Sequence, residues 1–251
     1  MRRMIVKRRT LLLYSGGLDS HLLWLHQDKP QRVMFTETVL TREQRELLLD
    51  PTWLPNDASK LLPMPPLPKW SGGFVPYRNL AFIMQASLLC GSQPVEILIG
   101  QTLEWQVDKN AAFYREMRSI ARRLARIDLI VRAPLANRTK TGIVRDALAR
   151  GVPVEEITNT HSCLTVTIVG QAEGKHCGRC SSCVARWAAF RNNGIVDLSY
   201  THEPTRFDYE KNVEAQRWMF RWQNVPMYLI RHAEMMRAFA RREKEGPWAL
   251  R

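Results

Sequence analysis

The sequence predicts an α/β protein with an open parallel sheet and helices on both faces, in the manner of a Rossmann-like fold. Residues 11–13 form a short apolar segment without polar alternation, which is typical of a strand buried on both faces of a parallel sheet, and 95–100 is another expected buried strand. Longer segments with apolar residues at helical spacing, such as 78–90 and 111–126, lie between or after them. Strands that alternate with helices of this length indicate βαβ units.

The expected elements can be placed in chain order. Strands are expected at 9–14, 32–36, 95–100 and 129–131, and helices at 20–26, 41–49, 78–90, 111–126 and 140–150. The proline-rich stretch 51–73 reads as an irregular loop, and a loop of this length inside a domain is often an active-site cover.

Three regions follow from this pattern. Residues 1–155 are expected to form a nucleotide-binding α/β domain, and residues 156–197 a small region with clustered cysteines. Residues 198–251 form a basic helical tail with Trp, Met and Phe at helical spacing, which favours packing helices or a dimer surface. We therefore expect a homodimer.

Composition narrows the class of protein. The 251 residues are 45% apolar and 24% charged, as in ordinary globular proteins. No apolar run approaches the roughly 20 residues that span a bilayer. The basic N-terminus is followed by only three leucines and then by a Ser-Gly-Gly turn, which is too short for a signal-peptide core. We expect a cytoplasmic protein without a membrane partner.

The net charge of +13 allows two interpretations. A basic face gains affinity for nucleic acid by releasing counterions from phosphates. Alternatively, the anionic partners are nucleotides, and arginines such as those of 118–126 form a solvated helix face. The second interpretation is favoured, and direct nucleic-acid binding stays the alternative.

A Ser/Gly-rich loop follows the first expected strand. It reads Tyr14, Ser15, Gly16, Gly17, Leu18, Asp19 and Ser20. The glycines let the main chain approach phosphate oxygens, and the N-terminus of the following helix favours an anion. Asp19 can hold the Mg²⁺ that accompanies a triphosphate. No Gly-Lys-Ser or Gly-Lys-Thr ending is present, so this is not a Walker loop. The competing interpretation is a simple turn in which Asp19 or Ser20 is the helix N-cap.

Four of the five cysteines form a cluster. Cys177, Cys180 and Cys183 follow a CxxCxxC pattern, and Cys163 lies fourteen residues upstream. Four thiolates can close a tetrahedral zinc site, and an iron–sulfur cluster uses the same ligands. We favour structural zinc. Cys90 lies in an apolar helical segment and is expected in the core.

The two motifs together resemble a known family. The loop is similar to the PP-loop of the N-type ATP pyrophosphatases, and the cysteine segment, with His161-Ser162-Cys163 before it, resembles the zinc region of 7-cyano-7-deazaguanine synthases. Weaker similarities are Pro76-Tyr77-Arg78-Asn79, with tyrosine where the family has glycine, and Pro134-Leu135 followed by Lys140. The resemblance covers about residues 9–197.

The resemblance implies an ATP-dependent ligase for deazaguanine (queuosine-type) biosynthesis. 7-Carboxy-7-deazaguanine is adenylated and ammonia displaces AMP. A second ATP then converts the amide into the nitrile. ATP and Mg²⁺ would be held by the loop, and Zn²⁺ by the four cysteines. Asp19 and Lys140 would be catalytic. The substrate would be bound by Arg78, Asn79 and Asp108.

Some segments depart from the family pattern. Residues 38–44 lack the usual Tyr-Gly-Gln-x-His stretch, and the substrate segment 106–110 keeps Asp108 but not the Cys-Arg after it. Three alternatives therefore stay open: a PP-loop tRNA-modifying enzyme similar to a thiolase, a deazaguanine enzyme that stops at the amide, and a zinc-knuckle nucleic-acid-binding module on an inactive nucleotide fold.

Overall fold

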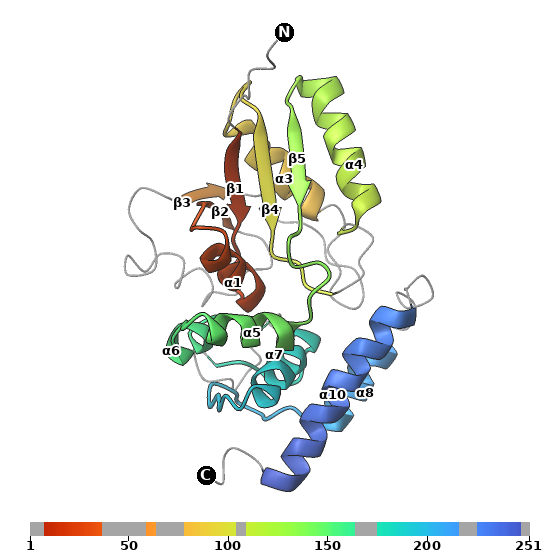
Figure 1. The fold of residues 1–251 in the computed structure, drawn as a ribbon. Coiled ribbons are helices and arrows are strands. Elements are labelled where there is room, and N and C mark those ends of the chain that lie inside the picture. Colours follow the sequence, from red (N-terminus) through yellow and green to blue (C-terminus); the bar gives the residue numbers. More distant parts are fainter. Residues whose placement is uncertain are drawn as a thin grey trace.

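One parallel sheet forms the centre of the molecule. The structure, a computed structural model, describes residues 8–36, 59–63, 78–103, 109–163, 175–215 and 225–246. Within these ranges five strands pair in the order β3-β2-β1-β4-β5, and every pair is parallel. The strands are β1 (Arg9–Leu13), β2 (Gln31–Thr36), β3 (Ser59–Pro63), β4 (Val95–Ile99) and β5 (Leu129–Arg132). The predicted α/β fold with a parallel sheet is confirmed (Figure 1).

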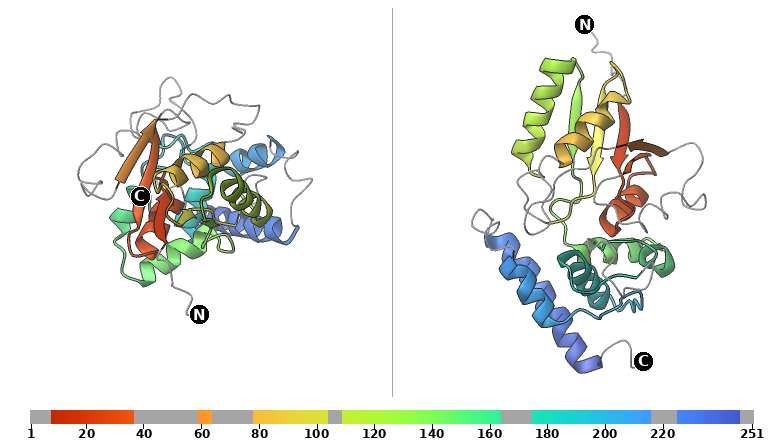
Figure 2. Two further views of the ribbon diagram at one scale, coloured as in Figure 1. Left: turned by 90° about the horizontal axis from the view of Figure 1, so that it is seen from above. Right: turned by 180° about the vertical axis from the view of Figure 1, so that it is seen from behind.

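Helices connect the strands and continue beyond the sheet. They are α1 (Leu18–His26), α3 (Arg78–Leu88), α4 (Ala111–Ile120) with the π-helical turn η2 (Ala121–Ala125), α5 (Lys140–Ala149), α6 (Val154–Thr158), α7 (Ser181–Asn192), α8 (Arg206–Ala215) and α10 (Val225–Glu245). Figure 1 and the right-hand view of Figure 2 show α5, α6 and α7 beyond the end of the sheet where α1 begins.

The alternation of side chains along β1 separates two cores. Leu11 joins a cluster with residues of α3 and α4, such as Ile83 and Met117. Leu12, on the other face, joins a cluster that runs through α1, α5 and α7 to α10. Because successive strand residues point to opposite faces, the adjacent Leu11 and Leu12 pack against helices on opposite sides of the sheet.

The long proline-rich loop was predicted wrongly at 59–63. Those residues form β3, which pairs with β2 along the register Arg32↔Ser59 to Thr36↔Pro63. β3 is an edge strand, and Pro63 is its last residue, a position where the missing N–H of proline costs little. The prolines dominated the sequence pattern, whereas pairing with β2 decided the structure. The rest of 51–73, the expected helix 41–49 and the segment 38–44 lie outside the described residues.

The helix expected at 111–126 is regular only to Ile120. The turn Ala121–Ala125 is π-helical, and Arg126 ends it with φ 54°. The side chains of Arg118, Arg122 and Arg123 are exposed, so the predicted solvated arginine face is present.

The described part of the C-terminal tail packs against the cysteine-containing region. The Trp187 ring of α7 lies 5.0 Å from the Phe239 ring of α10, between ring centroids. Met235, Ala238 and Phe239 are buried in the same core as α1 and α5. None of the helices in the described ranges combines the length and apolar character that crossing a membrane requires. The division into three regions stays a prediction.

Candidate active site and four-cysteine centre

The Ser/Gly loop joins β1 to α1 and is shaped by its own hydroxyl groups. Ser15 Oγ and Ser20 Oγ lie 3.2 Å apart, and Ser20 Oγ donates to the Gly17 carbonyl at 3.0 Å. Gly16 has φ 71°, a value that non-glycine residues rarely adopt. The N-cap of α1 is Gly17, which has no side chain, so the simple-turn interpretation with Asp19 or Ser20 as N-cap is wrong. The Leu18 N–H donates to the Ser162 hydroxyl, and the main-chain N–H groups of this first turn are an arrangement suited to an anion.

A second glycine, Gly100, lets the chain after β4 pass close to the start of α1. Gly100 follows β4, and a Cβ atom at this position would lie 2.7 Å from both Cα and N of Ser20. This distance is shorter than normal contacts allow, so only glycine permits the main chains to approach so closely. Sequence reasoning missed this role, although a glycine at the end of a buried strand was visible.

The structure brings the two predicted catalytic residues together. The Lys140 amino group donates to Asp19 Oδ2, across 121 positions of sequence. Both side chains are mostly buried. Thr102 Oγ1 donates to the same carboxylate oxygen at 3.4 Å. The other oxygen, Oδ1, is buried and has no hydrogen-bond partner among the described residues. Thr102 was not predicted, because it lies after β4 and carries no motif.

The position of Lys140 follows from local structure. Lys140 is the first residue of α5, and the Thr139 hydroxyl accepts a hydrogen bond from the Gly142 N–H at 3.1 Å as a side-chain N-cap. A cap of this kind holds the first turn of the helix. The lysine therefore extends from a rigid helix start toward the loop.

Two residues predicted to contact the cofactor have side chains in the protein interior. Tyr14 is buried and its hydroxyl lies 2.8 Å from His21 Nδ1. Burial raises the pKa of Tyr14 to about 12. The Leu18 side chain is in the core. The main chain of Tyr14 and Leu18 is still part of the loop region, and their role in nucleotide binding stays a prediction.

The predicted substrate residues are only partly described. Arg78 and Asn79 are the first residues of α3, with Asn79 buried. A helix between parallel strands runs antiparallel to them, so α3 begins at the carboxyl ends of the strands, where the Ser/Gly loop also lies. Asp108 lies outside the described residues. Their role in substrate binding stays a prediction.

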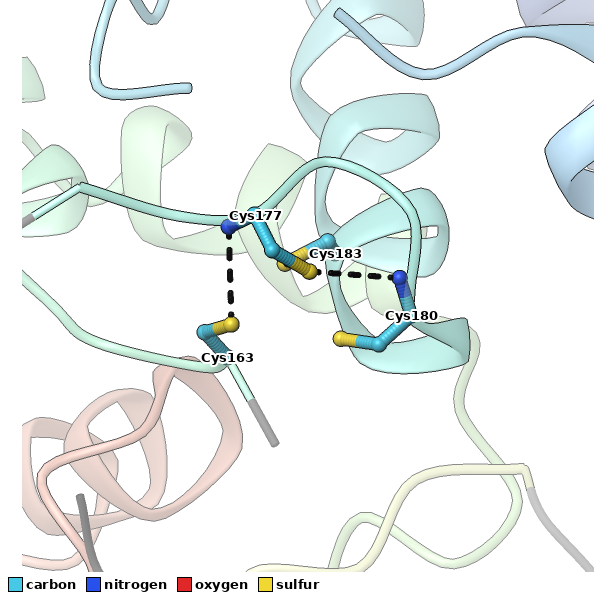
Figure 3. A group of neighbouring side chains, drawn as sticks. All are labelled: Cys163, Cys177, Cys180 and Cys183. Atoms are coloured by element: carbon cyan, nitrogen blue, oxygen red, sulfur yellow. Dashed lines mark hydrogen bonds between the residues drawn. The ribbon is translucent and has the colours of Figure 1, made fainter. Parts of the chain in front are cut away.

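The four clustered cysteines converge on one point (Figure 3). Their sulfur atoms all lie within 4.8 Å of one another, from Cys163, Cys177, Cys180 and Cys183. The Cys177 and Cys180 N–H groups donate to sulfur, at 3.5 Å to Cys163 and 3.4 Å to Cys177. Cys90, the remaining cysteine, is buried in the core as predicted.

The surroundings of the four sulfurs fit a divalent metal. Hydrogen bonds from the other thiols lower the pKa of Cys163. The pKa values of Cys180 and Cys183 are raised, first of all by their hydrogen bonds to Cys163. Four convergent sulfurs can act as thiolates together only when a cation offsets their mutual repulsion. Main-chain N–H donors to sulfur are the usual support of such ligands.

The loop that carries these cysteines is closed by another glycine. Gly178 has φ 75°, and a Cβ atom there would lie 1.5 Å from the His202 carbonyl oxygen. His161 and His176 stack at 4.6 Å beside the cluster. Four sulfurs are already available, so neither histidine is needed as a ligand.

The fold and the site together define a parallel α/β protein with a Ser/Gly loop after its first strand and a four-cysteine centre beyond the sheet. Residues 66–194 match the family described as "Queuosine biosynthesis protein QueC". This match covers half of the chain, and the protein belongs to the QueC family.

Curated relatives agree with this family. The chain is 32% identical over 143 residues to the 7-cyano-7-deazaguanine synthase of Myxococcus xanthus, which covers 53% of this chain and 56% of the relative. The synthase of Pelobacter propionicus is 39% identical over 72 residues, which are 28% of this chain and 29% of the relative. The synthase of Rickettsia africae is 38% identical over 69 residues, which are 28% of this chain and 27% of the relative. The matched part is about half the length of the first relative and less than a third of the others.

Proposed function

We propose that the protein is an ATP-dependent carbon–nitrogen ligase that converts 7-carboxy-7-deazaguanine and ammonia into 7-cyano-7-deazaguanine. The observation that carries this proposal is the contact of Lys140 with Asp19 beside the Ser/Gly loop, in a chain of the QueC family. The name of the relatives, 7-cyano-7-deazaguanine synthase, supports the choice of product.

The chemistry divides into two activations. A carboxylate oxygen of the substrate attacks the α-phosphorus of ATP and pyrophosphate leaves. Ammonia then displaces AMP to give the amide. In the second activation the amide oxygen attacks another ATP, and loss of AMP and a proton leaves the nitrile. Both activations require neutralisation of the leaving pyrophosphate and alignment of the oxygen with phosphorus.

The residues of this chain can meet those requirements. The main-chain N–H groups at the N-terminus of α1 can bind phosphate oxygens. Lys140 supplies a positive charge to the developing pyrophosphate charge. Asp19 Oδ1, which has no partner among the described residues, is suited to a Mg²⁺ ion that travels with the triphosphate.

The four-cysteine centre is proposed to bind zinc in a structural role. All four positions are thiols, which leaves no open coordination site of the kind that catalytic zinc keeps. We retain the division into a nucleotide-binding domain at 1–155, a zinc region at 156–197 and a basic tail at 198–251, and we propose a homodimer in the cytoplasm.

The experiment that tests the function is an incubation of the zinc-loaded protein with Mg-ATP, ammonia and 7-carboxy-7-deazaguanine, followed by mass analysis. AMP, pyrophosphate and a nitrile are expected. Accumulation of the amide would assign the shorter reaction. Absence of AMP from folded, zinc-loaded protein would contradict the proposal.

A variant of the loop makes the same test sharper. Asp19→Ala is expected to abolish pyrophosphate release while zinc content stays unchanged, because Asp19 contacts Lys140 and Thr102 rather than the cysteines. The matched control is Arg145→Ala, an exposed residue of α5. Wild-type activity of the Asp19 variant would remove the metal-binding role.

The thiolase-like alternative is less favoured by the structure. A thiolase needs a reactive cysteine, and Cys90 is the only one outside the cluster. Cys90 is 6% exposed, and burial raises the pKa of its thiol, so it is a poor nucleophile. Visible absorbance of the purified protein would favour an iron–sulfur cluster and reopen this alternative.

A further inference from the structure

The two residues that precede Cys163 contact the main chain of the Ser/Gly loop. The His161 N–H donates to the Gly16 carbonyl at 3.0 Å. The Ser162 hydroxyl oxygen accepts a hydrogen bond from the Leu18 N–H at 3.3 Å. A Cβ atom at Gly17 would lie 3.4 Å from the His161 carbonyl oxygen, so the two segments are in close contact. The contacts fall on the residues that a phosphate would meet.

The same segment is held from its other side by the cysteine centre. Ser162 is followed directly by Cys163, one of the four ligands. The Ser162 N–H donates to His176 Nε2 at 3.2 Å, and His176 directly precedes Cys177. Because Nε2 accepts, Nδ1 of His176 carries the proton and donates to Ser199 Oγ at 2.8 Å.

Ser162 therefore bonds in two directions at once. Its main-chain N–H is bound to the loop of the cysteine centre, and its hydroxyl is bound to the first residue of α1. The stacking of the His161 and His176 rings at 4.6 Å joins the same two segments a second time. Coupling between two sites can be carried by a contiguous chain of hydrogen bonds and packed side chains of this kind, and a measurement has to establish it.

We propose that Ser162 is a positioning residue through which the four-cysteine centre holds the Ser/Gly loop in its phosphate-binding conformation. The proposal rests on the proposed function for the identity of the ligand, but the coupling itself does not depend on it. When metal binds the four thiolates, Cys163 and Cys177 are fixed, and with them the segment that supports Gly16 and Leu18. Loss of the metal loosens the loop while the sheet stays folded.

The experiment compares Ser162→Ala, Ser162→Thr and the control Ser182→Ala. Ser182 lies on the first turn of α7 between two of the cysteines, and no described hydrogen bond joins its hydroxyl to the loop. Zinc content, hydrogen exchange of the amides in 14–20 and the Kd of a non-hydrolysable ATP analogue are measured for each protein. Wild-type protein treated with a zinc chelator is the fourth sample.

Ser162→Ala is expected to retain its zinc, to exchange loop amides faster and to bind the analogue about 3- to 10-fold more weakly, as befits loss of one hydrogen bond. Ser162→Thr keeps the hydroxyl and restores both values. Ser182→Ala matches wild type. Chelation accelerates exchange in 14–20 more than in β4 and β5, whose amides respond only to the loss of global stability.

Three results would overturn the coupling: wild-type exchange and affinity in Ser162→Ala, no rescue by threonine, or unchanged loop exchange after chelation. Loss of zinc from Ser162→Ala would show a purely structural role and overturn it too. Failure of wild-type protein to bind the analogue would instead contradict the proposed function, and the exchange data would still decide the coupling.

Discussion

The Ser/Gly loop and the four-cysteine centre lie side by side but are built in opposite ways. The loop is a contiguous run that Ser15 and Ser20 hold through weak hydroxyl contacts, and Ser15 is exposed. The centre brings together four sulfurs from two segments fourteen residues apart, and three of these cysteines are buried. A loop that binds a triphosphate, as proposed, cannot be tightly filled by protein groups. Under the proposed coupling, its rigidity is supplied from outside, by the neighbouring centre.

The largest effect is expected from breaking the centre. Cys183→Ser removes a fully buried ligand and should abolish stoichiometric zinc binding, lowering the free energy of unfolding by more than about 3 kcal/mol, because metal binding in such sites is folding free energy. Metal analysis and urea unfolding measure both. Cys90→Ala is the control and should keep its zinc; retention of zinc by the Cys183 variant would contradict the assigned ligand set.

Removal of the positive charge of Lys140, which contacts Asp19 of the loop, should leave the four-cysteine centre intact. Lys140→Ala is expected to slow pyrophosphate release by about 100- to 1000-fold, the usual consequence of removing a preorganised charge. Single-turnover assays at saturating ATP measure this. Arg145→Ala on the same helix should behave as wild type, and zinc content should not change in either variant. A reduction below tenfold would mean that Lys140 only pairs with Asp19.

Two glycines offer the sharpest direct comparison. Gly178→Ala places a methyl group 1.5 Å from the His202 carbonyl at φ 75° and should cost more than about 2 kcal/mol of stability and weaken zinc binding. Gly100→Ala, with contacts of 2.7 Å to Ser20, should cost about 1–3 kcal/mol and weaken nucleotide binding with zinc unchanged. Thermal melts, metal analysis and titration with an ATP analogue separate these outcomes. Zinc loss in the Gly100 variant would show that the coupling runs in both directions.

The smallest effect is expected from the protonation of His21, which lies in α1, the helix that follows the Ser/Gly loop. Burial, together with Arg32 and Lys29, lowers the pKa of His21 to about 4 from its usual 6.5. A neutral histidine in the folded state stabilises the protein above pH 6.5, and this contribution is lost as the pH falls toward 4. Between pH 7.5 and 5 the loss is about 2 kcal/mol.

Urea unfolding of wild type and His21→Asn at both pH values measures this difference. The variant should lose less stability on acidification by about that amount. The groups around His21 are Tyr14, whose hydroxyl is bound to it, Arg32, Lys29 and Glu156, which lies 3.5 Å from Nε2. Equal acid sensitivity of both proteins would mean that Glu156 compensates the charge.

Much of the fold was predictable because its signals are local. The buried strands at 9–14, 95–100 and 129–131 and the helix at 140–150 show in the sequence as apolar runs and helical spacing. The strand β3 was not predictable, because the prolines around it outweigh a short segment whose hydrogen bonds come from β2. The π-helical end of α4 also leaves no sequence signal.

The site divides in the same way. The spacing of the cysteines was enough to predict their cluster, and the glycines were enough to predict the loop. Thr102 carries no motif, and neither the glycine after the buried strand nor the Ser162 of the cysteine segment showed what it contacts, since these roles arise from contacts with residues far away in the chain.

By itself, the sequence therefore determined the parallel α/β class, the loop after the first strand and the cysteines that form the centre. These are properties of neighbouring residues. Only the tertiary structure decided that Lys140 meets Asp19, that Gly100 and Gly178 admit main-chain atoms, and that Ser162 joins the centre to the loop. Such contacts depend on how the sheet and helices pack, and packing is a property of the whole chain.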